Sequence, residues 1–114
     1  MTELTVHSSA DGDRSTLAVA GELDLGSVAE LRQHAEDELA SRHIRTLTLD
    51  LSELTFIDSS GLGLLVELKR TAATAKVTME IVNVPAGPAR VISIAGLSDT
   101  LGVSAGDKDD SPDD

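Results

Sequence analysis

The feature that most constrains this chain of 114 residues is a stretch in which a strand pattern passes directly into a helical one. Leu47, Leu49 and Leu51 alternate with polar residues, which is the period of a strand with one apolar face. After Asp58-Ser59-Ser60-Gly61, the apolar residues follow helical spacing instead. The unpaired N–H groups and the dipole of a helix N-terminus favour an anion or another hydrogen-bond acceptor. Function is therefore sought at this strand-to-helix junction.

The same two periods predict the other elements. Ser27 and Glu30 form a capping box that opens a helix, and Gly96 suits the left-handed end of another helix. Asp11-Gly12-Asp13 supplies the turn of an N-terminal hairpin. The expected elements are strands over residues 4–6 and 16–20, a helix over 28–41, a strand from residue 47, a helix over 60–74, a strand over 76–84, a helix with Pro88 in its first turn, and a short turn or helix over 97–103.

This order of elements predicts an α/β fold built on a single sheet. Right-handed crossovers make the second, third and fourth strands parallel and leave the first as an antiparallel edge strand. We expect a four- to five-stranded mixed, mostly parallel sheet packed with about four helices, in one domain over residues 1–105. Functional loops of such a sheet lie beyond the carboxyl ends of its strands, here residues 21–24 and 56–61. Residues 106–114 are Asp-rich and are expected to be a disordered acidic tail.

Charge and composition exclude several kinds of partner. The formal net charge of −11 repels phosphate backbones and anionic membrane surfaces, and Phe56, the single aromatic residue, provides no stacking platform for bases. We therefore expect no direct nucleic-acid partner and no membrane partner. The chain has no cysteine for disulfides or thiolate chemistry. It has neither a signal-peptide pattern nor an apolar run near the ~18 residues of a membrane span, so we expect a cytoplasmic protein.

The serine pair of the junction admits several interpretations. Asp58 or Ser59 as a simple N-cap of the following helix remains open from spacing alone. A nucleophilic serine is disfavoured because the glycine-flanked elbow needs Gly two residues earlier, where this chain has Ile57 or Asp58. The three possible bases, His7, His34 and His43, are also poorly placed for a catalytic triad. We therefore expect no enzymatic activity.

Two further interpretations of the junction also fail. Gly61-x-Gly63 is not followed by the Gly-Lys-Ser/Thr of a phosphate-binding loop, and Asp58 lacks the acidic pair that a phosphoaspartate receiver needs for its metal. The histidines do not form a metal cluster, so we expect no metal and no cofactor. A remaining interpretation is that Ser59 accepts phosphate. The modification adds about −1.5 to −2 charges, which a partner surface fitted to a neutral serine would have to desolvate.

Four blocks of the chain resemble, in order and spacing, the STAS domain family and in particular its anti-sigma factor antagonists. The blocks are Gly21-Glu22-Leu23-Asp24, Leu49-Asp50-Leu51-Ser52, Phe56-Ile57-Asp58-Ser59-Ser60-Gly61-Leu62-Gly63 and Ala95-Gly96-Leu97. The resemblance spans residues 3–104, and the chain departs from the family in two ways: Ala95 stands where the family usually has Thr, and the Asp-rich tail is extra. It implies an anti-sigma factor serine kinase as partner, phosphorylation of Ser59 by that kinase, and removal of the phosphate by a metal-dependent serine phosphatase. The partner-binding residues that it implies are Asp24, Asp58, Ser59, Ser60 and Gly61.

The function expected from this resemblance is that of an anti-sigma factor antagonist. The unphosphorylated protein binds the anti-sigma factor and releases the sigma factor, and phosphorylation of Ser59 switches binding off. The alternative is a STAS accessory subunit of a transport or stress-signalling complex, in which Ser59 is only a cap. A small nucleotide-binding or hydrolytic protein is the alternative in the enzyme class.

Overall fold

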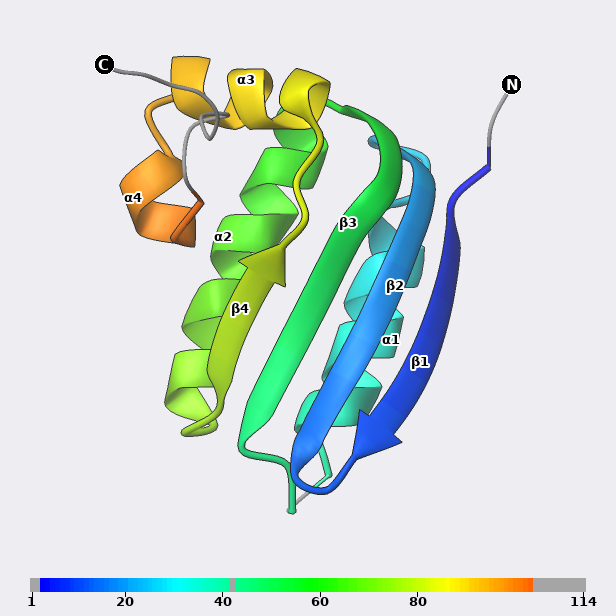
Figure 1. Cartoon of the computed structure of the whole chain (residues 1–114), viewed down its shortest axis with the longest axis vertical. Coiled ribbons are helices and arrows are strands. Elements are labelled where there is room, and N and C mark those ends of the chain that lie inside the picture. The colour runs from blue at the N-terminus through cyan, green and yellow to red at the C-terminus, as the bar shows by residue number, and fades with distance from the viewer. Residues whose placement is uncertain (1–2, 42, 104–114) are drawn as a thin grey trace.

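The computed structural model describes residues 3–41 and 43–103 (Figure 1). The segment 106–114, expected to be a disordered tail, lies outside the described residues. The elements follow the predicted order: β1 (Thr5–Asp11), β2 (Arg14–Leu23), α1 (Val28–Leu39), β3 (Thr46–Ile57), α2 (Ser59–Thr74), β4 (Thr78–Val82), α3 (Ala86–Ile94) and α4 (Ser98–Leu101).

The strands form one sheet in the order β1-β2-β3-β4. β1 pairs with β2 in antiparallel fashion, whereas β2, β3 and β4 are parallel neighbours. The predicted mixed, mostly parallel sheet with an antiparallel edge strand is therefore confirmed, with four strands. Figure 1 shows α1 and α2 behind the sheet and α3 at the end where β2 and β3 finish. Because functional loops of parallel sheets gather at that end, the site is sought there.

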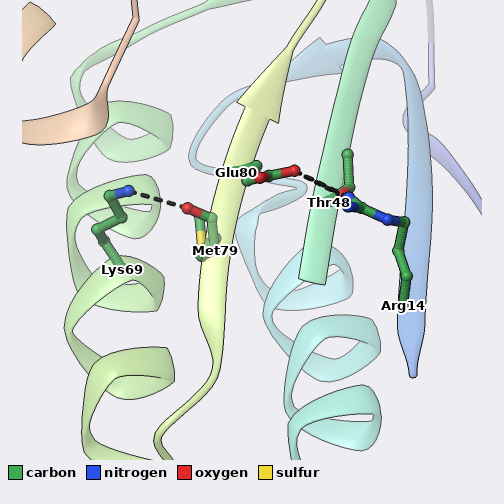
Figure 2. A network of polar contacts seen from close by, with 5 residues as sticks. All are labelled: Arg14, Thr48, Lys69, Met79 and Glu80. Atoms are coloured by element: carbon green, nitrogen blue, oxygen red, sulfur yellow. Dashed lines mark hydrogen bonds and ion pairs between the residues drawn. The ribbon is translucent and has the colours of Figure 1, made fainter. Parts of the chain in front are cut away.

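The core lies between the sheet and the helices α1 and α2, and it is aliphatic. Alternate residues of β2, and of β3 as far as Leu51, point toward these helices; beyond Leu51 the register shifts, and the buried residues of β3 are Leu54 and Ile57. The fully buried side chains include Leu17, Leu23, Leu47, Leu49 and Leu51 from the strands and Leu31, Leu65 and Leu68 from the helices. The other sheet face carries polar side chains. On it, Arg14 Nη1 donates to Thr48 Oγ1 at 2.8 Å and to Glu80 Oε1 at 2.9 Å, which joins three strands (Figure 2).

Several predicted boundaries were wrong by a few residues. α1 ends at Leu39 rather than residue 41, and α2 starts at Ser59 rather than residue 60. β4 is shorter than the predicted strand over 76–84 because Lys76 (φ 63°) and Asn83 (φ 57°) adopt left-handed conformations that a strand cannot continue through.

The chain between the second strand and the first helix also differs from its prediction. The expected loop over 21–24 is mostly strand, since β2 continues to Leu23, and Phe56 and Ile57 likewise belong to β3. The pairing of β2 with β3 shifts register between Gly21 and Glu22, where β3 has one extra residue; at Gly21 φ is +102° and a Cβ atom would lie 2.2 Å from the carbonyl oxygen of Glu3. Glycine therefore allows β2 to continue to the rim of the sheet.

The two predicted helix caps have different outcomes. The capping box was wrong: Ser27 precedes α1, but among the described residues its side chain makes no capping hydrogen bond to the helix. The left-handed end of α3 is confirmed, because Gly96 has φ 75° and its N–H donates to the Ser93 carbonyl at 3.0 Å. The N–H of Leu97 donates to the Ile92 carbonyl at 3.0 Å, which completes a Schellman motif.

Candidate partner-binding surface

The two loops that carry the predicted site residues lie side by side. β2 and β3 are parallel, and the last residues of the two strands, Leu23 and Ile57, are paired. The chain therefore leaves both strands at the same edge, with Asp24 and Asp58 as the next residues. The N–H of Asp58 donates to the Leu23 carbonyl at 3.2 Å, so a backbone hydrogen bond joins the two loops.

Asp58 is the N-cap of α2. Its Oδ1 accepts a hydrogen bond from the N–H of Gly61 at 3.1 Å. Ser59 is the first helical residue, is exposed, and makes no side-chain hydrogen bond to any residue of the described ranges. Of the two caps that the sequence left open, the structure uses Asp58, and the interpretation of Ser59 as a cap was wrong. Ser60 is half-buried at the next position.

Gly61 is buried where α2 meets the end of β2. A Cβ atom at this position would lie 2.7 Å from Ile57 Cγ1 and 2.9 Å from both Cγ and the carbonyl oxygen of Leu23. Such distances are shorter than van der Waals contact allows, so the two loops approach this closely only because residue 61 has no side chain. Gly61 is therefore buried beneath the two loops and allows their close approach.

The loop between β2 and α1 is held by its own hydrogen bonds. Asp24 Oδ1 accepts from the N–H of Gly26 at 3.0 Å, and the Asp24 carbonyl accepts from the N–H groups of Ser27 and Val28, both at 3.0 Å. Ser27 Oγ accepts from the N–H of Asp24 at 3.0 Å and donates to the Glu22 carbonyl at 2.9 Å. The hydroxyl expected to cap α1 thus organises the preceding loop instead.

This loop presents Leu25 to solvent. The side chain of Leu25 is 75% exposed, between Asp24 and Gly26. Single exposed apolar side chains are common on protein surfaces, and Leu25 is a binding candidate because it directly follows Asp24 at the edge where β2 and β3 end. The sequence analysis did not predict Leu25 as a site residue. The available signal was an apolar residue between an acid and a glycine at the carboxyl end of a strand.

An acidic groove begins beside this loop. It has a volume of about 470 Å³, and its described lining residues are Glu3, Leu4, Glu22, Asp24, Gly26, Ser27 and Glu30. The lining includes four carboxylate side chains and no basic one, so its electrostatic complement is a cationic surface. Within residues 3–41 and 43–103, no three acidic or histidine side chains are arranged to hold a metal ion.

An ion pair joins the helices α1 and α2, and both of its side chains are partly exposed. Arg32 Nε and Nη2 donate to the two carboxylate oxygens of Glu67 at 3.0 and 2.9 Å. These hydrogen bonds lower the pKa of Glu67 and raise that of Arg32. The bidentate geometry fixes the relative position of the two helices more strictly than a single contact would. No pattern in the sequence indicated this pair, because its partners are 35 residues apart.

Together these features describe a small α/β domain with an exposed serine beside a capping carboxylate at the edge where β2 and β3 end. The chain belongs to the STAS domain family. A family model described as "Mlab, STAS domain" matches residues 6–103. The resemblance that the sequence blocks indicated is therefore confirmed.

Similar proteins support this assignment. A STAS-domain containing protein of Pseudomonas aeruginosa is 26% identical over 101 residues, which cover 89% of this chain and 98% of that protein. The crystal structure of an anti-sigma factor antagonist from Mycobacterium paratuberculosis has a TM-score of 0.80 at 23% identity, covering 94% of this chain and 90% of that one. The unphosphorylated anti-sigma factor antagonist SpoIIAA gives 0.71 at 19% identity, covering 93% and 91%.

The same fold also occurs within a much larger protein. The structure of SLC26A9 matches with a TM-score of 0.72 at 18% identity, covering 85% of this chain but only 18% of that one. At these identities the structural matches show a shared fold. In the part of the chain that the structure describes, no helix combines the length and apolar character needed to cross a membrane.

Proposed function

We propose that the protein is a non-enzymatic anti-sigma factor antagonist whose binding is controlled by phosphorylation of Ser59. In the unphosphorylated state it binds an anti-sigma factor that is also a serine kinase, and the sigma factor is released. The kinase transfers phosphate to the Ser59 hydroxyl, binding is lost, and a serine phosphatase restores the unphosphorylated state. All of these partners act in the cytoplasm and none of the steps requires DNA or a membrane.

The observation that carries this proposal is that Asp58 and Ser59 have separate roles at the start of α2. Asp58 caps the helix through Gly61, which leaves the neighbouring Ser59 exposed and without a hydrogen bond in the described part of the chain. A residue placed this way is open to modification, and its modification breaks no described contact of the domain. The added phosphate changes the surface by about −1.5 to −2 charges while the fold stays intact.

The neighbouring loop supports a binding surface of mixed character. Leu25 offers an exposed apolar side chain, and Asp24 lines the acidic groove at the base of the same loop. Apolar anchors surrounded by charged groups are the usual composition of a protein interface. The partner therefore presents an apolar pocket for Leu25 with cationic groups at its rim. Ser60 adjoins this surface, and Gly61 keeps its two loops together.

The phosphorylation site is tested by mass spectrometry of the native protein. The tryptic peptide that contains Ser59 also contains Ser60, so fragment ions must assign the phosphate. We expect modification at Ser59, and none in a Ser59→Ala variant. We also expect Ser59→Ala, used as bait in native lysate, to retain an anti-sigma factor with kinase activity. Phosphate found on Ser60 alone would contradict the assignment.

A second candidate is an accessory subunit of a transport or stress-signalling complex. Two observations favour this second candidate. The description of the matching family model, "Mlab, STAS domain", includes the name Mlab, and the same fold forms part of the SLC26A9 chain. In this case the surface formed by Asp24, Leu25 and Asp58 binds a fixed partner, and Ser59 is not modified. Co-purification with a membrane ATPase, together with an unphosphorylated Ser59 peptide, would favour this second function.

A further inference from the structure

A basic groove lies along the outer edge of the sheet at β4. β4 is the last strand in the sheet order, so one row of its backbone groups faces away from β3. The groove has a volume of about 480 Å³, and its described lining residues are Lys69, Ala73, Lys76, Val77, Thr78 and Met79. This lining contains two lysines and no carboxylate, in contrast to the acidic groove beside Asp24.

One of these lysines contacts the free edge directly. Lys69 Nζ donates to the Met79 carbonyl at 2.9 Å (Figure 2), so this carbonyl points away from β3. A lysine ammonium has three donors, and this contact uses one of them. Lys76 is exposed at the other end of the lining. The groove therefore offers at least two cationic groups to an anionic ligand, in a protein whose net charge is −11.

The chain passes next to this groove just before its most acidic segment. A Cβ atom built on Gly102 would lie 3.9 Å from Lys69 Nζ, so the backbone at Gly102 is close to the lysine. Asp107 is the fourth residue after Val103, and four extended residues span at most roughly 14 Å. Residues 107–114 contain five aspartates and one lysine, a net charge of −4. The segment can therefore reach Lys69 and Lys76 without crossing the molecule.

We propose that the acidic segment 107–114 docks in the groove formed by Lys69, Lys76 and the outer edge of β4. Each exposed ion pair is weak by itself, but the short tether gives the segment an effective concentration in the millimolar range. The docked segment covers an open strand edge that would otherwise be available for pairing with another chain. Because the contact is electrostatic, it weakens as salt is added. This proposal does not depend on the role of Ser59.

The absence of cysteine from the sequence makes the proposal directly testable. A nitroxide label on Ser111→Cys in the full chain broadens the NMR signals of amide groups near residue 111. Among residues 3–94, which are far from the label in the sequence, we expect the strongest broadening at residues 73–79 at low salt, and its loss at about 0.5 M NaCl, where the Debye length is roughly 4 Å. Lys76→Gln should reduce the broadening. Arg90→Gln, which removes an exposed charge on α3 outside the groove lining, is the control and should leave it unchanged.

Other patterns of broadening would overturn the proposal. Broadening that is uniform over the surface, or strongest at residues distant from β4, means that the segment does not dock in this groove. The same holds if high salt or Lys76→Gln has no effect. Mixing labelled protein with unlabelled, isotope-enriched protein detects contact between molecules. Broadening at residues 73–79 of the unlabelled copy that disappears on dilution would assign the groove to a second copy instead.

Discussion

At the junction of β3 and α2, neighbouring residues have separate tasks. Asp58 caps the helix, Ser59 faces solvent, and Gly61 allows the helix to approach Leu23. In the proposed function, the local conformation and the switch therefore depend on different residues. A substitution of Ser59 is expected to alter binding without altering stability. A substitution of Gly61 is expected to alter stability without altering binding directly.

Two glycines of α2 give a matched test of close packing. Gly61→Ala places a methyl group 2.7 Å from Ile57 Cγ1, so we expect a loss of about 1–3 kcal/mol in the free energy of unfolding. A methyl group at position 63 would have no described atom within 4 Å, so Gly63→Ala should gain about 0.5–1 kcal/mol from helix propensity. Urea unfolding measures both changes. Equal effects of the two substitutions would contradict the packing role of Gly61.

The exposed Leu25 is expected to act only in binding. Leu25→Ala should weaken the complex with the anti-sigma factor by roughly 1–2 kcal/mol, because it removes an apolar anchor. Thermal unfolding should be unchanged, since the side chain is 75% exposed. Ile94→Ala is the matched control, because Ile94 is 80% exposed on α3 and belongs to neither loop. An unchanged dissociation constant for Leu25→Ala, measured by calorimetry, would show that Leu25 does not belong to the binding surface.

At the scale of elements, the sequence predicted types and order correctly but not local hydrogen bonds. Alternating leucines and helical spacing reflect which side chains are buried. A small sheet covered by helices can bury these side chains in only a few arrangements. Ser27 shows the limit of such patterns. Its position matches a capping box, yet a turn centred on Asp24 brings the Glu22 carbonyl within 2.9 Å of its hydroxyl. The Asp24 N–H, and not an N–H of α1, donates to the Ser27 hydroxyl oxygen, and this choice between two donors depends on loop geometry that spacing alone does not contain.

The loop role of Ser27 leads to a prediction about the start of α1. Ser27→Ala should destabilise the protein by about 1 kcal/mol, because the Glu22 carbonyl and the Asp24 N–H lose a partner. In a capping box, Glu30→Ala would also destabilise the helix. Here it should leave the unfolding midpoint nearly unchanged, because Glu30 is exposed. A substantial loss of stability in Glu30→Ala would contradict this prediction and support the capping box.

The contact between α1 and α2 predicts a pH dependence. The hydrogen bonds from Arg32 hold the pKa of Glu67 below its ordinary value, so the folded state binds fewer protons at this site than the unfolded state does. The stabilisation is therefore fully present above the ordinary pKa of 4.5 and is lost as the pH falls below it, through the lowered pKa of Glu67 in the folded state. The difference in unfolding free energy between the native protein and Glu67→Gln should shrink over this range. Glu53→Gln changes an exposed carboxylate of β3 as a control, and its difference should not follow that trend.

At the scale of the whole molecule, the fold was largely predictable and the binding surface only partly so. The aliphatic core and the parallel connections follow from periodicity, and the family blocks located Asp24 and Asp58. The sequence could not choose between Asp58 and Ser59 as the cap, since both residue types favour that position. The exposure of Leu25 also depends on how the loop folds over Asp24. The choice of the cap and the exposure of Leu25 both depend on where side chains point after the sheet has formed.

Charge also acts on the whole molecule. The net charge of −11 includes −4 from residues 107–114, so the remainder of the chain is still acidic at −7. The acidic lining of the groove next to Asp24 is complementary to a cationic ligand, and the basic lining of the groove along β4 is complementary to an anionic one. We assign the acidic groove to a cationic partner surface and the basic groove to the acidic segment of the chain itself.

The central claim, that phosphate on Ser59 decides binding, is tested by the affinities of three variants for the cognate anti-sigma factor. Calorimetry should show that Ser59→Ala binds as tightly as the unmodified protein. Ser59→Asp should bind on the order of 10- to 100-fold more weakly, a loss of about 1.4–2.8 kcal/mol. Ser60→Asp, which adds the same charge one residue further on, should have a smaller effect. Equal dissociation constants for Ser59→Ala and Ser59→Asp would contradict the account.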